Sequence, residues 1–180
     1  EKVYNFNPIP EELTKEDAKY VLGAQGNVWT EYMQTSEKVE YMAFPRAIAL
    51  AEVVWSSSTN KNYDDFINRL EHFQKRLDVL KVNYANHLYE VKGNFISTNN
   101  QMIYELKSTS KTQPIYYSVS GDELTELYTK PILVDTSIKI KAAVLNANKK
   151  QLGGFFEETI NLHKAVGKKI TLNVEPNKAY

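Results

Sequence analysis

The sequence predicts an α+β chain, with helices in the first half and short strands in the second. Residues 47–55 and 63–80 repeat apolar side chains every three or four positions, which is the period of an amphipathic helix. Beyond residue 90, short β-rich runs alternate with turn residues at regular intervals, a pattern typical of an all-β sandwich. We therefore expect two domains, 1–88 and 89–180, in this chain of 180 residues.

The first domain begins with an irregular segment. Residues 1–12 carry two prolines and predict an extended loop, and Thr14, with Asp17 three residues later, predicts a short capped helix. The run YVLGAQGNVW, residues 20–29, is apolar without alternation, as in strands that are covered on both faces. Its glycines indicate a close approach of the backbone to a neighbour, or a tight bend. This run therefore predicts a buried strand.

Two helical regions follow this predicted strand. Ser36 is the expected N-cap of the first region, and Pro45 predicts a kink or a break into two helices because proline lacks a backbone N–H. Residues 63–80 predict a clean amphipathic helix. One strand does not make a sheet, so residues 1–88 predict the last strand and helices of a (β/α)₈ barrel whose other strands lie upstream. The chain also lacks an initiator Met, and we expect it to be a piece of a longer protein.

The second domain predicts a small all-β, Ig-like sandwich. Turn signals occur around Gly93, Gly121, Asn146 and Gly153. Between them lie the candidate strands QMIYELKS, PIYYSVS, KPILV, SIKIKAAVLN, FFEETINLH and KKITLNV. In PIYYSVS, strand alternation places Tyr116 and Tyr117 on opposite faces, one in the core and the other toward a neighbouring domain or a glycan.

The composition argues against several classes of function. Lys plus Arg and Asp plus Glu each number 22, so the neutral chain has no basic footprint for nucleic acid or an anionic membrane. No apolar run approaches the roughly 18 residues of a membrane span. The chain has no cysteine, and its three histidines stand alone without an HExxH motif, so we expect no metal and no cofactor. Phosphate-binding glycine motifs and a G-x-S-x-G nucleophile are also absent.

Trp29 and Glu31 are the residues whose pattern points most directly to chemistry. Residues two apart on a strand point to the same side. At the C-terminal end of a barrel strand both would face the mouth, where such enzymes keep their sites. An indole against a pyranose face, with a carboxylate that accepts from sugar hydroxyls, would form a glycan subsite. The alternative is structural, with Trp29 in the core and Glu31 capping the next helix.

Other charged groups indicate structural roles. The acids at positions 64–65 begin a predicted helix, where they favour the positive end of its dipole. Arg46 is expected to pair with a buried acid such as Glu52, or to lie at the bottom of the barrel. The two glutamates at positions 157–158 lie in a candidate strand, and we expect them to be solvated.

Two stretches together resemble a known family. LGAQGNVWTEY, residues 22–32, has the pattern G-x-Q-x-x-x-W-x-E-Y, and EYMAFPRAIALAEVVWS, residues 40–56, adds a Pro-Arg step and an Ala-rich helix. In this order they resemble the end of the catalytic barrel of glycoside hydrolase family twenty, the β-N-acetylhexosaminidases, over roughly residues 3–85. Residues 114–150 resemble the small β-domain that follows the barrel in many bacterial members, although residues 118–120 read Ser-Val-Ser where Thr-Leu-Asp is usual.

The resemblance implies roles for the two motif residues. Trp29 would form a wall of the pocket for the terminal sugar, and Glu31 would bind hydroxyls of that sugar, mainly the 4-hydroxyl. The family implies exo-acting removal of terminal GlcNAc or GalNAc by retaining, substrate-assisted hydrolysis, in which the 2-acetamido oxygen attacks C1. Its catalytic Asp-Glu pair has no match here, because the step Asp122-Glu123 lies in the β-domain. We therefore expect no catalytic residue in this chain and no hydrolase activity from the chain alone.

Partners and location are expected from the same resemblance. The partners would be the terminal N-acetylhexosamine of a glycan and the upstream catalytic barrel of the same protein, with no nucleic acid and no membrane span. We expect an extracytoplasmic location, periplasmic or secreted, although residues 1–12 carry no signal-peptide pattern. The alternative function is a non-catalytic glycan-binding or spacer module, and a purely structural pair of domains is a third hypothesis.

Overall fold

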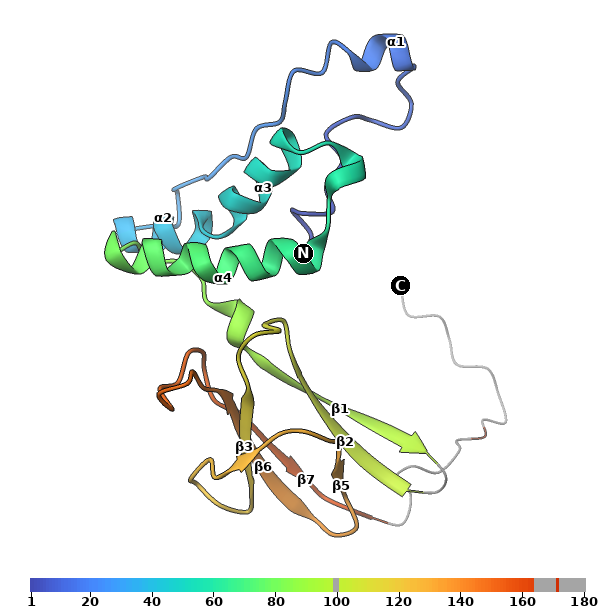
Figure 1. The fold of residues 1–180 in the computed structure, drawn as a ribbon, viewed down its shortest axis with the longest axis vertical. Coiled ribbons are helices and arrows are strands. Elements are labelled where there is room, and N and C mark those ends of the chain that lie inside the picture. The colour runs from blue at the N-terminus through green and yellow to red at the C-terminus, as the bar shows by residue number, and fades with distance from the viewer. Residues whose placement is uncertain (99–100, 164–170, 172–180) are drawn as a thin grey trace. The chain divides into compact units, whose positions relative to one another are not determined.

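The computed structural model describes residues 1–98, 101–163 and 171, and the chain divides into two compact units (Figure 1). The first, which we call the helical unit, comprises Glu1–His87 together with Ser110–Thr112. The second, which we call the strand unit, comprises Leu88–Thr109 together with Gln113–Tyr180. The helices α1 to α4 belong to the first unit and the strands β1 to β7 to the second.

The helical unit confirms the predicted helices and the predicted break at Pro45. The chain leaves helical geometry at Phe44 and re-enters it after Pro45, which donates no backbone hydrogen bond. A 3₁₀ turn, η1, spans Ser58–Asn60. The helices are α1 (Lys15–Ala18), α2 (Ser36–Ala43), α3 (Arg46–Trp55) and α4 (Tyr63–Val79).

Side-chain caps begin three of these helices. Thr14 accepts a hydrogen bond from the backbone N–H of Asp17, which confirms the predicted capped helix. The expectation for α2 is wrong by one residue, because Thr35, not Ser36, is the N-cap and accepts from the N–H of Lys38. Both are hydroxyl residues, so the sequence does not distinguish which of them leaves helical geometry. At α4, Asn62 has the same role.

The core of the helical unit forms along one face of α4. Phe66, Ile67, Leu70 and Leu77 recur at helical spacing and are buried, as the periodicity predicts. Tyr4, from the N-terminal segment, is also buried, and its ring centroid lies 4.9 Å from that of Phe66. The aromatic contact thus ties the first residues of the chain to α4.

The predicted strand over residues 20–29 is absent. This segment connects α1 and α2 as an extended coil alongside α3, with no ladder partner among the described residues (Figure 1). A strand requires hydrogen bonds to a neighbouring strand, and the described part of the helical unit contains none. The prediction of a buried, paired strand is therefore wrong on both counts, since the segment has no ladder partner and Leu22 and Trp29 are 97% and 71% exposed.

The strand unit contains two antiparallel sheets. The three-stranded sheet has the order β1-β2-β5, and the four-stranded sheet has the order β4-β3-β6-β7. Five candidate strands from the sequence are present, whereas the sixth, KKITLNV, lies almost wholly outside the described residues. A 3₁₀ turn, η2 (His87–Tyr89), precedes the first strand. The strands are β1 (Val91–Thr98), β2 (Gln101–Ser108), β3 (Ile115–Val119), β4 (Glu126–Leu127), β5 (Ile132–Leu133), β6 (Ile138–Val144) and β7 (Phe156–Ile160).

Gly93 does not break the chain, contrary to the expectation from sequence. It lies within β1 and pairs with Leu106 of β2. A Cβ atom at this position would lie 2.1 Å from the hydroxyl oxygen of Tyr104, so only glycine leaves room for that ring. The glycine therefore marks a close approach inside a strand rather than a turn.

Tyr104 links the two sheets of the strand unit. It lies on β2, and its hydroxyl donates a short hydrogen bond to the Glu158 carboxylate on β7. Burial first, and then the bond to Glu158, raise the pKa of Tyr104 above its usual value. The expectation that residues 157–158 are both solvated is therefore wrong for Glu158, which has a partner in the other sheet.

The core of the four-stranded sheet includes four completely buried residues of β6. Ile140, Ala142 and Val144 alternate along the strand, and Ala143, on the opposite face, is completely buried as well. Across the sheet, Tyr117 pairs in register with Ala142, and Tyr116 with Ala143. The two tyrosines thus occupy opposite faces, as predicted. The prediction that one of them lies in the core is wrong, because both are half-buried.

Candidate functional site

Trp29 and Glu31 lie at the end of the extended segment, immediately before α2. The backbone N–H of Met33 donates to the carbonyl of Thr30 at 2.9 Å, so Glu31 and Tyr32 occupy the two central positions of a tight turn. Trp29 precedes this turn, and its side chain is 71% exposed. Glu31 is also exposed. The structure thus presents an indole and a carboxylate two residues apart on an accessible corner of the helical unit.

The structural alternative for these two residues is wrong in the described chain. Trp29 is not part of the core of the helical unit, because most of its surface is accessible. Glu31 does not cap α2, because Thr35 occupies the N-cap position and supplies the side-chain acceptor. These findings remove the two packing roles but do not test a role in sugar binding.

A glycine positions the segment that carries the motif. A Cβ atom at Gly26 would lie 3.0 Å from Cδ2 of Leu50 on α3, so the missing side chain lets the extended backbone approach the helix closely. No atom lies within 4 Å of the corresponding position at Gly23. The side chain of Gln25 donates to that of Asn27 at 2.6 Å within the same stretch. Of the two alternatives predicted for the glycines, a close approach or a tight bend, Gly26 shows the close approach, three residues before Trp29.

Tyr32 is an additional candidate that the residue-by-residue sequence analysis did not single out. It shares the turn with Glu31, and its side chain is 92% exposed. The signal was present in the sequence, because the pattern G-x-Q-x-x-x-W-x-E-Y ends on this tyrosine. A phenol next to the carboxylate adds a second flat ring and a hydroxyl that donates and accepts.

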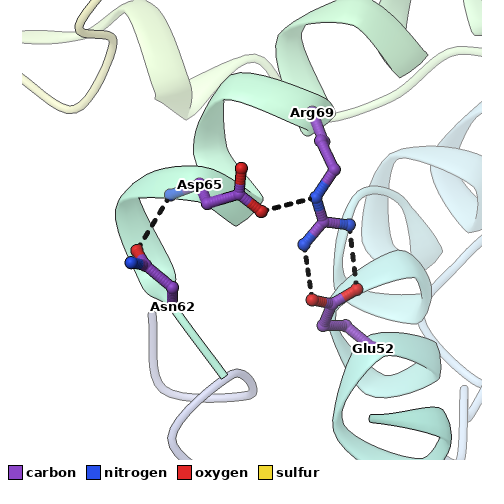
Figure 2. Close-up of polar contacts among 4 residues, drawn as sticks. All are labelled: Glu52, Asn62, Asp65 and Arg69. Carbon is purple, nitrogen blue, oxygen red and sulfur yellow. Dashed lines mark hydrogen bonds and ion pairs between the residues drawn. The ribbon is translucent and has the colours of Figure 1, made fainter. Parts of the chain in front are cut away.

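The most extensive charged cluster of the helical unit joins α3 to α4 (Figure 2). The guanidinium of Arg69 binds both carboxylate oxygens of Glu52, at 2.5 and 3.0 Å, and its Nε donates to Asp65 at 2.8 Å. These two carboxylates raise the pKa of Arg69. Asn62, in the same view, caps α4 by accepting from the N–H of Asp65. Each of these groups has a partner within the protein, so the cluster stabilises the packing of α3 against α4.

Arg46 does not pair with Glu52, contrary to one of the two sequence expectations. Its Nη1 donates to the backbone carbonyls of Tyr41 and Met42, at 3.1 and 2.8 Å. These carbonyls lie in the last turn of α2, where a cation suits the negative end of the helix dipole. The residue thus stabilises the break between α2 and α3, while Glu52 binds Arg69 instead.

A cavity in the helical unit is lined by Gly23, the first residue of the motif, but lies apart from Trp29 and Glu31. It has a volume of about 290 Å³, and neither Trp29 nor Glu31 lines it. Its walls come from the N-terminal segment, the start of the extended segment and the end of α3, including Pro8, Leu22, Val53 and Lys61. The cavity therefore gives no support to a site at the tryptophan and glutamate.

Charged and aromatic groups on the strand unit form pairs on the sheet surface. Lys141 lies between Asp122, at 3.8 Å, and Glu157, at 3.5 Å, and its ammonium is 4.7 Å from the centre of the Phe155 ring. The ammonium of Lys149 lies 3.5 Å from the centre of the Tyr116 ring. Such pairs are typical of cross-strand contacts on a sheet.

Two negative findings apply to the described residues. No group of three or more histidines and acids there is arranged to hold a metal ion. No helix in that part of the chain is both long and apolar enough to cross a membrane.

Comparison with known proteins connects the motif to one family. Residues 1–58 match the family model described as the catalytic domain of glycosyl hydrolase family 20. A beta-hexosaminidase of Porphyromonas gingivalis is 38% identical over 138 residues, which cover 73% of this chain and 18% of that protein. The beta-hexosaminidase subunit alpha of Mus musculus is 35% identical over 75 residues, which cover 42% of this chain and 14% of that subunit. The chain thus spans less than a fifth of the length of either relative.

Proposed function

We propose that the chain carries part of a glycosyl hydrolase family 20 catalytic domain and that the complete protein is an exo-acting β-N-acetylhexosaminidase. The family match spans residues 1–58 and so contains the whole motif from Gly23 to Tyr32. The observation that carries the proposal is the exposed Trp29–Glu31 pair within that match, since the described chain gives neither residue a packing or capping role.

We propose that Trp29 and Glu31 bind the terminal sugar. The indole would remove an apolar face of the pyranose from water, and the carboxylate would accept hydrogen bonds from its hydroxyls, mainly the 4-hydroxyl. The orientation of the 4-hydroxyl distinguishes the gluco from the galacto sugar, so Glu31 would influence the choice between GlcNAc and GalNAc. Both residues position the substrate and perform no proton transfer in this proposal.

Catalysis would come from residues outside this chain. The proposed reaction is retaining and substrate-assisted: the 2-acetamido oxygen of the sugar attacks C1 while an acid protonates the leaving oxygen. The step Asp122-Glu123 is no candidate for the catalytic pair, because it follows β3 in the strand unit and Asp122 pairs with Lys141. We therefore predict no turnover of a chromogenic N-acetylglucosaminide by the chain of residues 1–180 alone, and measurable turnover would contradict this.

The test of the proposal is kinetic, in the complete enzyme. Glu31→Gln should lower kcat/KM for aryl N-acetylhexosaminides by roughly tenfold to a thousandfold, because one or two hydrogen bonds to a charged acceptor are weakened. Glu37→Gln is the matched control, since Glu37 is exposed in the first turn of α2 and should leave kcat/KM unchanged. Equal kinetics for Glu31→Gln and the wild type, with the fold intact, would exclude Glu31 from the site.

The second candidate function is a glycan-binding or spacer role for the strand unit. The observation that favours it is the exposed ring of Phe155 beside the charged groups of Lys141 and Glu157. Titration of the chain with chitooligosaccharides separates the two roles: binding that Phe155→Ala abolishes favours a glycan module, and absence of binding favours a spacer.

We also propose an extracytoplasmic location, as expected for an enzyme that acts on glycans.

A further inference from the structure

A short connection of the strand unit belongs to the helical unit. β2 ends at Ser108 and β3 begins at Ile115, yet Ser110–Thr112, between them, clusters with residues 1–87. The chain therefore passes from one unit to the other after His87, returns at residue 110 and leaves again after residue 112. β2 and β3 belong to different sheets, and a loop that only connected those two sheets would not need to be part of the other unit.

A buried carboxylate on α4 holds this connection. The hydroxyl of Thr112 donates a short hydrogen bond to Oε2 of Glu71, whose residue is only 5% exposed. Ser110 is buried as well, and so is Gln74, one turn after Glu71 on the same helix. A carboxylate with so little access to water depends on its protein partners, and loss of the hydroxyl would leave Oε2 without this one.

We propose that the Ser110–Thr112 connection is an anchor that couples the folding of β2 and β3 to that of α4. Release of the connection leaves the Glu71 carboxylate short of a donor and removes the restraint on the chain between the two strands. Opening of α4 likewise frees residues 110–112, so the connection between β2 and β3 loses its fixed point. The strand unit thereby contributes to the stability of a helix that lies next to the family-matched segment.

Hydrogen exchange of the full chain tests this coupling. Thr112→Val keeps the shape of the side chain and removes the donor, and it should speed exchange of the protected amides of α4 and of β2 and β3 together, by about tenfold to a hundredfold. Thr125→Val is the matched control, because Thr125 is exposed in the loop before β4 and should change neither set. Faster exchange confined to residues 110–112, or to only one of the two sets, would overturn the proposal.

Two further variants keep the test decisive if Thr112→Val does not fold. Thr112→Ser retains the hydroxyl and should preserve most of the protection in both sets. Glu71→Gln retains an acceptor without the charge and should speed exchange in both sets by a smaller factor than loss of the hydroxyl. Wild-type exchange rates throughout Glu71→Gln, or a loss of protection in Thr112→Ser equal to that in Thr112→Val, would each contradict an anchor built on this hydrogen bond.

Discussion

The two units use apolar, extended segments in different ways. In the strand unit, the runs around β2, β3 and β6 form ladders with one another or with their neighbours, and β6 buries its alternating residues completely. In the helical unit, residues 20–29 also form an apolar run along an extended coil (Figure 1), yet they form no ladder and leave Trp29 exposed. An apolar run in the sequence therefore indicates an extended backbone, whereas strand pairing depends on whether a partner strand lies beside it.

The largest effect on stability should follow from a core deletion in the strand unit. Ile140→Ala removes three heavy atoms from a completely buried position on β6 and should lower the free energy of unfolding by about 2–5 kcal/mol. Leu133→Ala on β5 is the control, because half of its surface is exposed and its change should stay well below that value. Urea unfolding followed by circular dichroism measures the free energy of unfolding of both variants. Equal losses in the two would contradict the expected difference between a buried and a half-exposed position.

A smaller effect is expected where β1 passes Tyr104. Gly93→Ala places a methyl group 2.1 Å from the Tyr104 hydroxyl, whose bond to Glu158 opposes displacement of the ring, and should cost about 1–3 kcal/mol. The added variant Tyr104→Phe removes the nearest clashing atom, so the cost of Gly93→Ala should be smaller in that background. Gly154→Ala meets no atom within 4 Å and should be close to neutral in the same unfolding experiment.

The smallest effect on stability should come from the motif itself. Trp29→Ala in this chain should change the free energy of unfolding by less than about 0.5 kcal/mol, because its side chain is mostly exposed and makes no core contact. Thermal unfolding of the chain measures this. A loss of unfolding free energy as large as that of Ile140→Ala would show that the indole is a packing residue. That result would contradict the proposed role of Trp29 in sugar binding.

Local signals in the sequence predicted much of the fold. The period of α4, the break at Pro45 and the cap at Thr14 each depend on a few adjacent residues, so they are readable without the structure. Gly93 was misread because a strand glycine and a turn glycine look alike until Tyr104, eleven positions away, is placed against it. The partner of Glu158 was missed for the same reason, since Tyr104 comes from another sheet.

The candidate site was only partly predictable. The spacing of Trp29 and Glu31 and the motif around them singled these residues out as candidates. The glycines of the segment predicted a close approach or a tight bend, and Gly26 marks a close approach. The expected strand geometry was not found, because Glu31 lies in a turn rather than in a paired strand. Long-range pairing, such as that of Arg69 with Glu52 in place of Arg46, depends on how helices pack and not on local sequence.

The most direct test is a crystal structure of the complete protein with bound N-acetylglucosamine. The account predicts one face of the sugar against the Trp29 indole and the Glu31 carboxylate within hydrogen-bonding distance of its 4-hydroxyl. A structure in which both side chains are enclosed by protein packing, with the sugar bound elsewhere, would contradict it.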